Sequence, residues 1–118
     1  MTAVRLEESE QVAGRGSRRT TWWVQQEQQW IPAVKVAGCT VEKLATGPGV
    51  VWSRALWLDL SVGTLVTRVI AEPMVQRPRS TLDHLLLTSG PASTRRTRST
   101  YRVDARGRLV TLPRPSES

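Results

Sequence analysis

The stretch VVWSRALWLDL at residues 50–60 restricts the possible folds of this chain more than any other. Its hydrophobic side chains recur at every second position, and Leu56, Leu58 and Leu60 share one side of the pattern. Successive side chains of a β-strand point to opposite faces, so a period of two predicts a strand with one buried face. Because the backbone groups of a strand need partners on neighbouring strands, we expect a β-sheet.

The residues that follow predict an antiparallel hairpin. SVGT at residues 61–64 is typical of a tight turn, and LVTRVIAE at residues 65–72 would return beside residues 50–60. In that register Trp57 lies beside Arg68 on the outer face of the sheet. The favoured interpretation of this pair is a cation–π contact that stabilises the sheet.

A second hairpin is predicted over residues 100–112, TYRVDARGRLVTL. Gly107 suits the left-handed position of a three-residue loop, because glycine adopts positive φ without steric cost. That loop pairs Val103 with Leu109. The residues before it, 92–99, are expected to form a basic loop that enters an edge strand.

Trp22–Val24 has strong strand propensity, and we expect an edge strand there. Such an edge is a place where two copies of the chain can pair as a homodimer. Pro32 predicts an edge strand or a bend, because proline donates no hydrogen bond to a neighbouring strand.

One short helix is expected after these strands. Ser80–Asp83 resembles a capping box, LDHLLL continues it, and Gly90-Pro91 ends it. The fold class is therefore mainly β (α+β): a small antiparallel sheet or partial barrel of about five to seven strands with one covering helix.

A length of 118 residues suits one domain. Residues 1–19 lack aromatic side chains and end in GRGSRR, which predicts a flexible charged arm. Residues 20–112 are then the single globular domain, and residues 113–118 a disordered tail.

The net charge of +7 is unevenly distributed. Residues 75–118 contain nine arginines and three acidic residues, a balance of +6, whereas residues 20–74 are neutral. A one-sided positive field attracts anionic partners, although it also serves as a solubilising surface. Of the 17 basic residues only Lys35 and Lys43 are lysine, which suggests a GC-rich bacterial coding background.

Several functional classes find no support in the sequence. No apolar run approaches the ~20 residues of a membrane span, and the polar first residues do not resemble a signal peptide. We therefore expect a cytoplasmic protein without a membrane partner. With one cysteine, Cys39, and one histidine, His84, we expect no cofactor, no metal site and no enzymatic activity.

The favoured function is nucleic-acid binding through TRRTRSTYR at residues 94–102. Arginine forks and hydroxyl groups contact phosphates, and an aromatic ring can stack on a base. The basic arm adds further contacts with the nucleic-acid backbone. The candidate binding residues are Arg18, Arg19, Arg95, Arg96, Arg98, Tyr101 and Arg102.

The alternative is a protein-interaction or inhibitor module, for example a phage or mobile-element accessory protein. Five tryptophans are many for a small domain, and exposed tryptophans are common interface hot spots. In this interpretation the sheet face binds an acidic protein surface. Its candidate residues are Trp22, Trp23, Trp57 and Arg68.

Overall fold

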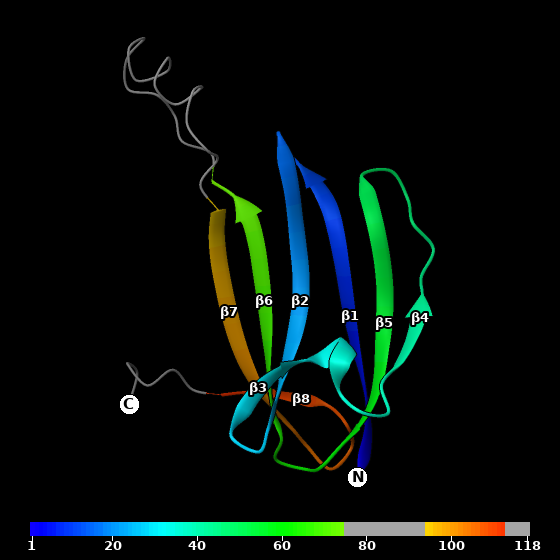
Figure 1. Cartoon of the computed structure of the whole chain (residues 1–118), viewed down its shortest axis with the longest axis vertical. Coiled ribbons are helices and arrows are strands. Elements are labelled where there is room, and N and C mark those ends of the chain that lie inside the picture. The colour runs from blue at the N-terminus through cyan, green and yellow to red at the C-terminus, as the bar shows by residue number, and fades with distance from the viewer. Residues whose placement is uncertain (75–93, 113–118) are drawn as a thin grey trace.

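A computed structural model describes residues 1–74 and 94–112 of the chain. Its eight strands form one antiparallel sheet, in which β4-β5-β1-β2-β6-β7-β8 are consecutive neighbours and β3 pairs with the last residues of β2 (Figure 1). The seven consecutive strands curl into a half-barrel, so the prediction of a mainly β, partly barrel-like fold is confirmed. The strands are β1 (Thr2–Ala13), β2 (Gly16–Gln26), β3 (Gln29–Pro32), β4 (Thr40–Lys43), β5 (Val50–Leu60), β6 (Leu65–Pro73), β7 (Thr94–Val103) and β8 (Leu109–Thr111).

The covering helix and the tail at residues 113–118 both lie outside the described residues. Within residues 1–74 and 94–112 the helical structure is one 3-10 turn, η1 (Ala33–Lys35). No helix in those two ranges is both apolar and long enough to cross a membrane.

The strand predicted at residues 50–60 is confirmed as β5, with Leu56, Leu58 and Leu60 buried. The hairpin predicted between β5 and β6 is wrong. β5 pairs with β1 and β4, whereas β6 pairs with β2 and β7. The reason is the length of β1, which pairs with β5 from Thr2 to Gln11, so that β1 and β2 both lie between β5 and β6 in the sheet. A long ladder over a shared hydrophobic face outweighs the local preference for a tight hairpin.

The prediction of a flexible arm at residues 1–19 is also wrong, because these residues form β1 and the first part of β2. Val4 and Leu6 alternate with exposed polar residues and are 1% exposed. Their period-two pattern continues at Glu8, where a carboxylate occupies a buried position. The acidic residues of this segment suggested an exposed arm, although its alternating residues form a strand with one buried face.

The strand predicted at Trp22–Val24 is confirmed within β2, but its expected edge position is wrong. β6 lies along one side of β2, and β3 pairs with Trp23–Gln26 on the other. β3 itself is the edge strand and ends at Pro32, as the proline predicts.

The core requires the sheet to divide. β1 and β2 pair only over residues 9–13 of β1 and 16–20 of β2. In this register even-numbered residues of β1 and odd-numbered residues of β2 lie on the same face. The hydrophobic core nevertheless unites even residues of both strands, including Leu6 and Trp22. Where β1 and β2 are no longer paired, before Ser9 in β1 and after Thr20 in β2, the sheet therefore folds over itself. There the face of β2 that carries its even-numbered residues packs against β1 and β5.

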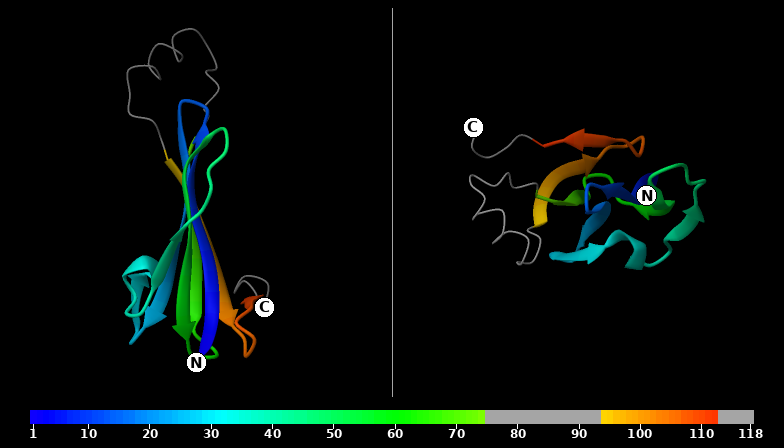
Figure 2. Two further views of the ribbon diagram at one scale, coloured as in Figure 1. Left: turned by 90° about the vertical axis from the view of Figure 1, so that its right-hand side faces the viewer. Right: turned by 90° about the horizontal axis from the view of Figure 1, so that it is seen from above.

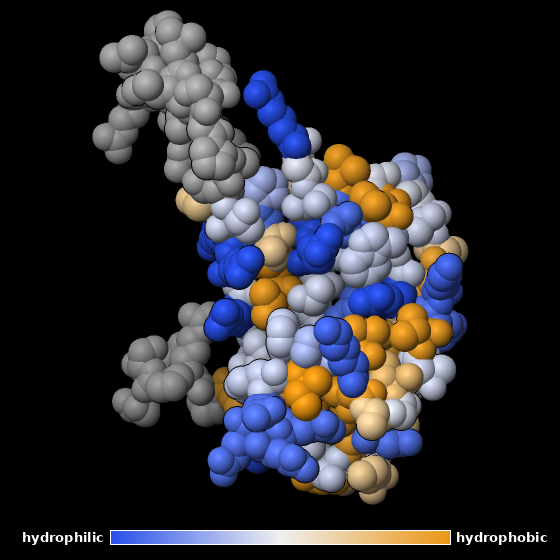
Figure 3. Space-filling model, viewed as in Figure 1, coloured by the Kyte–Doolittle hydropathy of each residue, from blue (hydrophilic) through white to orange (hydrophobic). Residues whose placement is uncertain are grey.

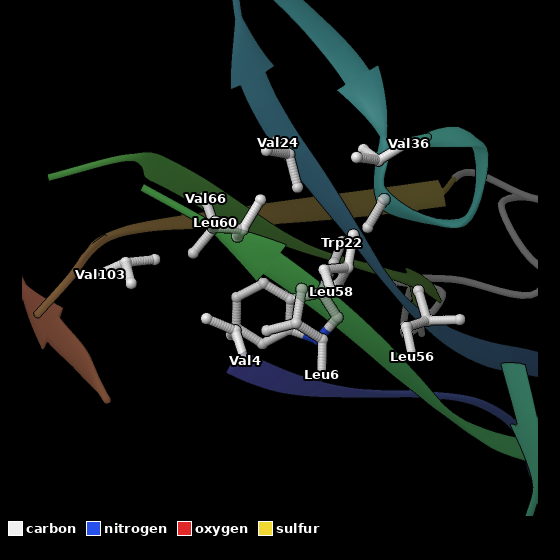
Figure 4. Packing of buried hydrophobic residues seen from close by; sticks show 11 residues of the cluster. Val4, Leu6, Trp22, Val24, Val36, Leu56, Leu58, Leu60, Val66 and Val103 are labelled. Atoms are coloured by element: carbon white, nitrogen blue, oxygen red, sulfur yellow. The ribbon is translucent and has the colours of Figure 1, made fainter. Parts of the chain in front are cut away.

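The figures show the consequence of this division. Seen edge-on, the upper part of the sheet is one thin layer, and the lower part widens with β3 and β8 on opposite sides (Figure 2). Side chains from the two parts point toward one another in the widened region (Figure 4). The buried cluster consists of Val4, Leu6, Trp22, Val24, Ala33, Val36, Leu56, Leu58, Leu60, Val66 and Val103.

We call the point where β1 and β2 separate, next to the last pair Ser9–Thr20, the fork. Glu8 of β1 and Trp22 of β2 lie at this point. The Glu8 side chain is 2% exposed, and its Oε2 accepts a 2.8 Å hydrogen bond from the backbone N–H of Trp22. The indole Nε1 of Trp22 donates to the carbonyl oxygen of Glu7 at 3.0 Å. Two side chains thus provide partners for backbone groups that the separated strands no longer pair.

Arg54 neutralises the buried carboxylate. Its Nε and Nη2 donate to Oε1 of Glu8 at 3.0 and 2.7 Å, which is a two-bonded, charge-assisted contact. The guanidinium also lies over the ring of Trp52, 4.9 Å from its centroid. Arg54 lies on the same side of β5 as Leu56 and Leu58, and its ion pair explains why an arginine is stable there.

The second hairpin is confirmed as β7 and β8, with Val103 opposite Leu109 and Gly107 at φ +77°. The backbone N–H of Asp104 donates to the carbonyl of Arg108 at 2.9 Å. The expected basic loop before it is replaced by β7, which begins at Thr94.

The Asp104 carboxylate makes this turn sensitive to acid. Its Oδ1 accepts hydrogen bonds from the backbone N–H groups of Arg108 and Arg106, both at 2.8 Å, and these bonds hold the pKa of Asp104 below its ordinary value of 3.8. A lowered pKa stabilises the folded turn above the ordinary carboxyl range, and this contribution is lost as the pH falls through the lowered pKa. Carboxyl carbon NMR should report a pKa below 3.8, and Asp104→Asn should remove this acid-dependent part of the unfolding free energy. A measured pKa at or above 3.8 contradicts the prediction.

Candidate nucleic-acid interface

An open groove of about 670 Å³ lies over β2, β6 and β7 and is bordered by β3 and η1. Figure 3 views the side on which β3 lies, and the surface above β3 alternates between hydrophilic and hydrophobic patches. We call this site the arginine groove. Its arginines are Arg19, Arg54, Arg96 and Arg98, and its other residues include Trp23, Trp30, Thr21, Thr67, Thr100, Val69 and Ala71.

The strand register sets the order of side chains across the groove. Arg96 of β7 is opposite Ala71 of β6, which is opposite Arg19 of β2. Two strand spacings therefore separate the Arg96 and Arg19 backbones, a distance of about 10 Å. The short side chain of Ala71 leaves the floor between these two arginines low.

The next row of side chains along the strands has a similar order. Arg98 is opposite Val69, and Val69 is opposite Thr21. Side chains that face each other across an antiparallel pair lie on the same face of the sheet. The floor is therefore made of small side chains, and arginines lie on both sides of it.

The four arginines differ in the charge that they present. Arg19 binds Oε1 of Glu10 at 2.7 and 3.1 Å, and Arg54 binds the buried Glu8. Among the ion pairs formed within residues 1–74 and 94–112, none involves Arg96 or Arg98. The uncompensated positive charge of the groove therefore comes from β7.

Two tryptophans line the side of the groove nearest β3. Trp23 is opposite Pro32 in the β2–β3 ladder and also opposite Thr67 of β6, so its indole lies on the groove face. Trp30 belongs to the edge strand and is 43% exposed. Trp30 is opposite Gln25, one row beyond Trp23, so its exposed ring lies toward the Thr100 end of the groove and not directly opposite Arg96 or Arg98.

The structure brings together three of the residues predicted for nucleic acid, namely Arg19, Arg96 and Arg98. Arg102 shares the face of Arg96 and Arg98 through its even position on β7, although it does not line the groove. Arg96, Arg98 and Arg102 therefore share one face of β7, because alternate residues of a strand point to the same side.

The remaining predicted contacts lie on the opposite face of the sheet. Arg95 is opposite Glu72 in the β6–β7 pair, and Nε of Arg18 is 3.9 Å from Oε2 of Glu72. Tyr101 packs against Trp22 with ring centroids 5.7 Å apart. These three residues do not line the arginine groove.

The residues of the alternative hypothesis do not form one surface. Trp22 is a core residue that is 7% exposed, and Trp23 lies on the other side of its strand. Arg68 stacks over the ring of Tyr101 at 5.7 Å. The predicted neighbourhood of Trp57 and Arg68 is wrong, because β5 and β6 are not paired.

Trp57 lies on the far side of β5, where it is 41% exposed. Arg5 lies 5.7 Å from its ring centroid, and the indole Nε1 donates to Oε2 of Glu42 at 2.9 Å. The predicted cation–π contact of Trp57 is thus made by Arg5 of β1.

The predicted nucleic-acid contacts did not include Arg54, Trp23 and Trp30, which all line the groove. A signal for Arg54 was present, because an arginine on the leucine face of a strand requires a polar partner. Trp30 had no comparable signal, since its position opposite β7 depends on how β3 folds against β2.

The free thiol in the described parts of the chain is Cys39, which is partly buried. Partial burial raises the pKa of the Cys39 thiol, with the nearby Glu8 carboxylate acting in the same direction. Within residues 1–74 and 94–112, His, Cys, Asp and Glu side chains form no group of three suited to a metal ion.

A scan of protein-family models, a search of curated proteins and a search of solved structures each found no match to this chain.

Proposed function

We propose that this protein binds nucleic acid in the arginine groove. The observation that carries the proposal is the pair Arg96 and Arg98, which face a groove containing Trp23 and Trp30 and form no ion pair with the described acidic residues. Cations beside accessible aromatic rings form the combination that recognises a phosphate backbone together with its bases.

The arrangement of hydroxyl groups supports the same chemistry. Thr67 and Thr100 are opposite one another on the groove face, and their Oγ1 atoms are hydrogen-bonded at 2.9 Å. A hydroxyl has both donor and acceptor capacity, so Thr100, the more exposed of the two, retains the ability to contact a phosphate or sugar oxygen. Arg96, Arg98 and Thr100 form a line of donors along β7.

The proposal predicts that Arg96→Ala/Arg98→Ala weakens nucleic-acid binding at least tenfold, since each lost arginine removes a charge-assisted contact. The magnitude of the slope of log affinity against log salt concentration should fall by about two, one for each phosphate contact that is lost. Fluorescence anisotropy with labelled DNA and RNA, single- and double-stranded, at low and moderate salt measures both quantities.

The matched control is Arg95→Ala/Arg106→Ala. It removes the same charge from exposed positions, with Arg95 on the opposite face of β7 and Arg106 in the β7–β8 turn. We expect this control to lose much less affinity than the groove variant. Equal losses would assign binding to net charge alone, and absence of binding by the unmodified chain at low salt would reject the proposed function.

A further inference from the structure

We infer that the arginine groove takes an unpaired strand of nucleic acid, with phosphates on Arg96 and Arg98 and a base stacked on Trp30. This inference rests on the proposed function and specifies its substrate class. It follows from the dimensions of the groove, the positions of its free charges and the exposure of one indole ring.

The dimensions favour a single strand over a duplex. The groove volume of about 670 Å³ lies within the range of small-ligand sites, roughly 300–1,000 Å³. β3 and η1 border it, with Trp30, Pro32 and Val34 among the lining residues. The bases of an unpaired strand can reach the aromatic side chains of such a groove, whereas a duplex keeps its bases stacked inside and presents only its backbone to the site.

The two arginines without ion pairs are spaced like successive phosphates of a nucleic-acid strand. Arg96 and Arg98 are two residues apart on β7, which separates their Cα atoms by about 6.7 Å along one face. This repeat is comparable to the separation of successive phosphates in an extended chain. A nucleic-acid backbone running along β7 therefore meets one guanidinium at each of two neighbouring phosphates.

The far side of the groove is suited to the bases. Thr100, Thr67, Trp23 and Pro32 form one continuous row from β7 across β6 and β2 to β3. If a nucleic-acid backbone runs along β7 from Arg96 and Arg98 to Thr100, a base attached beside Thr100 projects across Thr67 toward the indoles of β2 and β3. Trp30 offers an accessible ring there, and stacking contributes about 1–3 kcal/mol per base.

The chain provides a matched pair of tryptophans to test this inference. Trp30 and Trp57 are exposed to nearly the same extent, 43% and 41%, but only Trp30 lines the arginine groove. The probes are a labelled oligothymidylate of about twelve nucleotides, an abasic chain with the same number of phosphates, and a duplex of equal length, a size chosen from known single-strand sites. Anisotropy is measured for the unmodified chain, Trp30→Leu, Trp30→Phe and Trp57→Leu.

We expect the unmodified chain to bind oligothymidylate at least tenfold more tightly than the abasic chain or the duplex. Trp30→Leu should weaken oligothymidylate binding by roughly 5- to 100-fold, the equivalent of one lost stacking contact, and leave abasic-chain binding unchanged. Trp30→Phe should recover part of the loss, and Trp57→Leu should have no effect. Thermal unfolding of each variant checks that the fold is retained.

Three results overturn the inference in distinguishable ways. If Arg96→Ala/Arg98→Ala abolishes binding but Trp30→Leu does not change it, the groove holds only the phosphate chain and the proposed function stands. If the duplex binds as tightly as the single strand, selectivity for unpaired bases is wrong. If the unmodified chain binds a labelled polyglutamate peptide of similar length but none of the nucleic-acid probes, the groove recognises acidic protein and both proposals fail.

Discussion

Replacing Gly107 with alanine should lower the free energy of unfolding by about 3 kcal/mol, the largest effect that we expect from a single methyl group in this chain. Two penalties act together. The residue has φ +77°, a region that alanine adopts only with strain, and an added Cβ would overlap the backbone carbonyl oxygen of Ala3. The backbone of Ala3 is held in the β1–β5 ladder and cannot rotate aside, so the β7–β8 turn must move away from β1.

Gly38→Ala separates these two penalties. Gly38 has a similar φ of +82°, but a Cβ at that position meets nothing within 4 Å. Chemical denaturation should show a loss of about 1 kcal/mol for this control, the strain alone. If Gly107→Ala costs no more than Gly38→Ala, the close packing of the turn against Ala3 is wrong.

Glu8→Ala should lower the unfolding free energy by about 3 kcal/mol, the lower end of the range for breaking a buried ion pair. The change removes the acceptor of the Trp22 backbone N–H and leaves the Arg54 guanidinium without its carboxylate. Arg54 is 31% exposed and regains some hydration, which keeps the loss from being larger. Because Trp22 also belongs to the core, the effect should appear as global destabilisation in urea unfolding.

Glu10→Ala is the matched control for this experiment. Glu10 is the next residue of β1 on the same face, and its partner Arg19 is 57% exposed. Exposed ion pairs contribute about 0.2–1 kcal/mol, so the control should be much less destabilised. Equal losses in the two variants would contradict the special role of Glu8 at the fork.

The fork also connects stability with the proposed site. Glu8 and Arg54 line the arginine groove, and Trp22 contacts both the groove and the core. Where the two strands separate, β2 turns one face to the core and the other, with Trp23, to the groove. The contacts that stabilise the division of the sheet therefore also position the groove floor.

The strands with strong local patterns were predicted well. The boundaries of β5 follow from alternation alone, and the β7–β8 hairpin follows from one glycine flanked by β-formers. β1 was missed because its acidic residues outweighed the alternation of Val4, Leu6 and Glu8. A carboxylate at a buried position is interpretable only once its partner is known, and Arg54 is 46 residues away in the chain.

The site was predicted only in part for a related reason. The common face of Arg96 and Arg98 depends on neighbouring residues of one strand, and the amino-acid order is enough to predict it. The pairing of β6 with β2, the position of Trp30 across from β7 and the neutralisation of Arg19 depend on which strands become neighbours. Alternation specifies which side chains share a face, because it is a property of a single backbone. Which strands pair depends on segments that are distant in the chain. The pairing that forms is the one that gives the whole sheet the most favourable burial and hydrogen bonding.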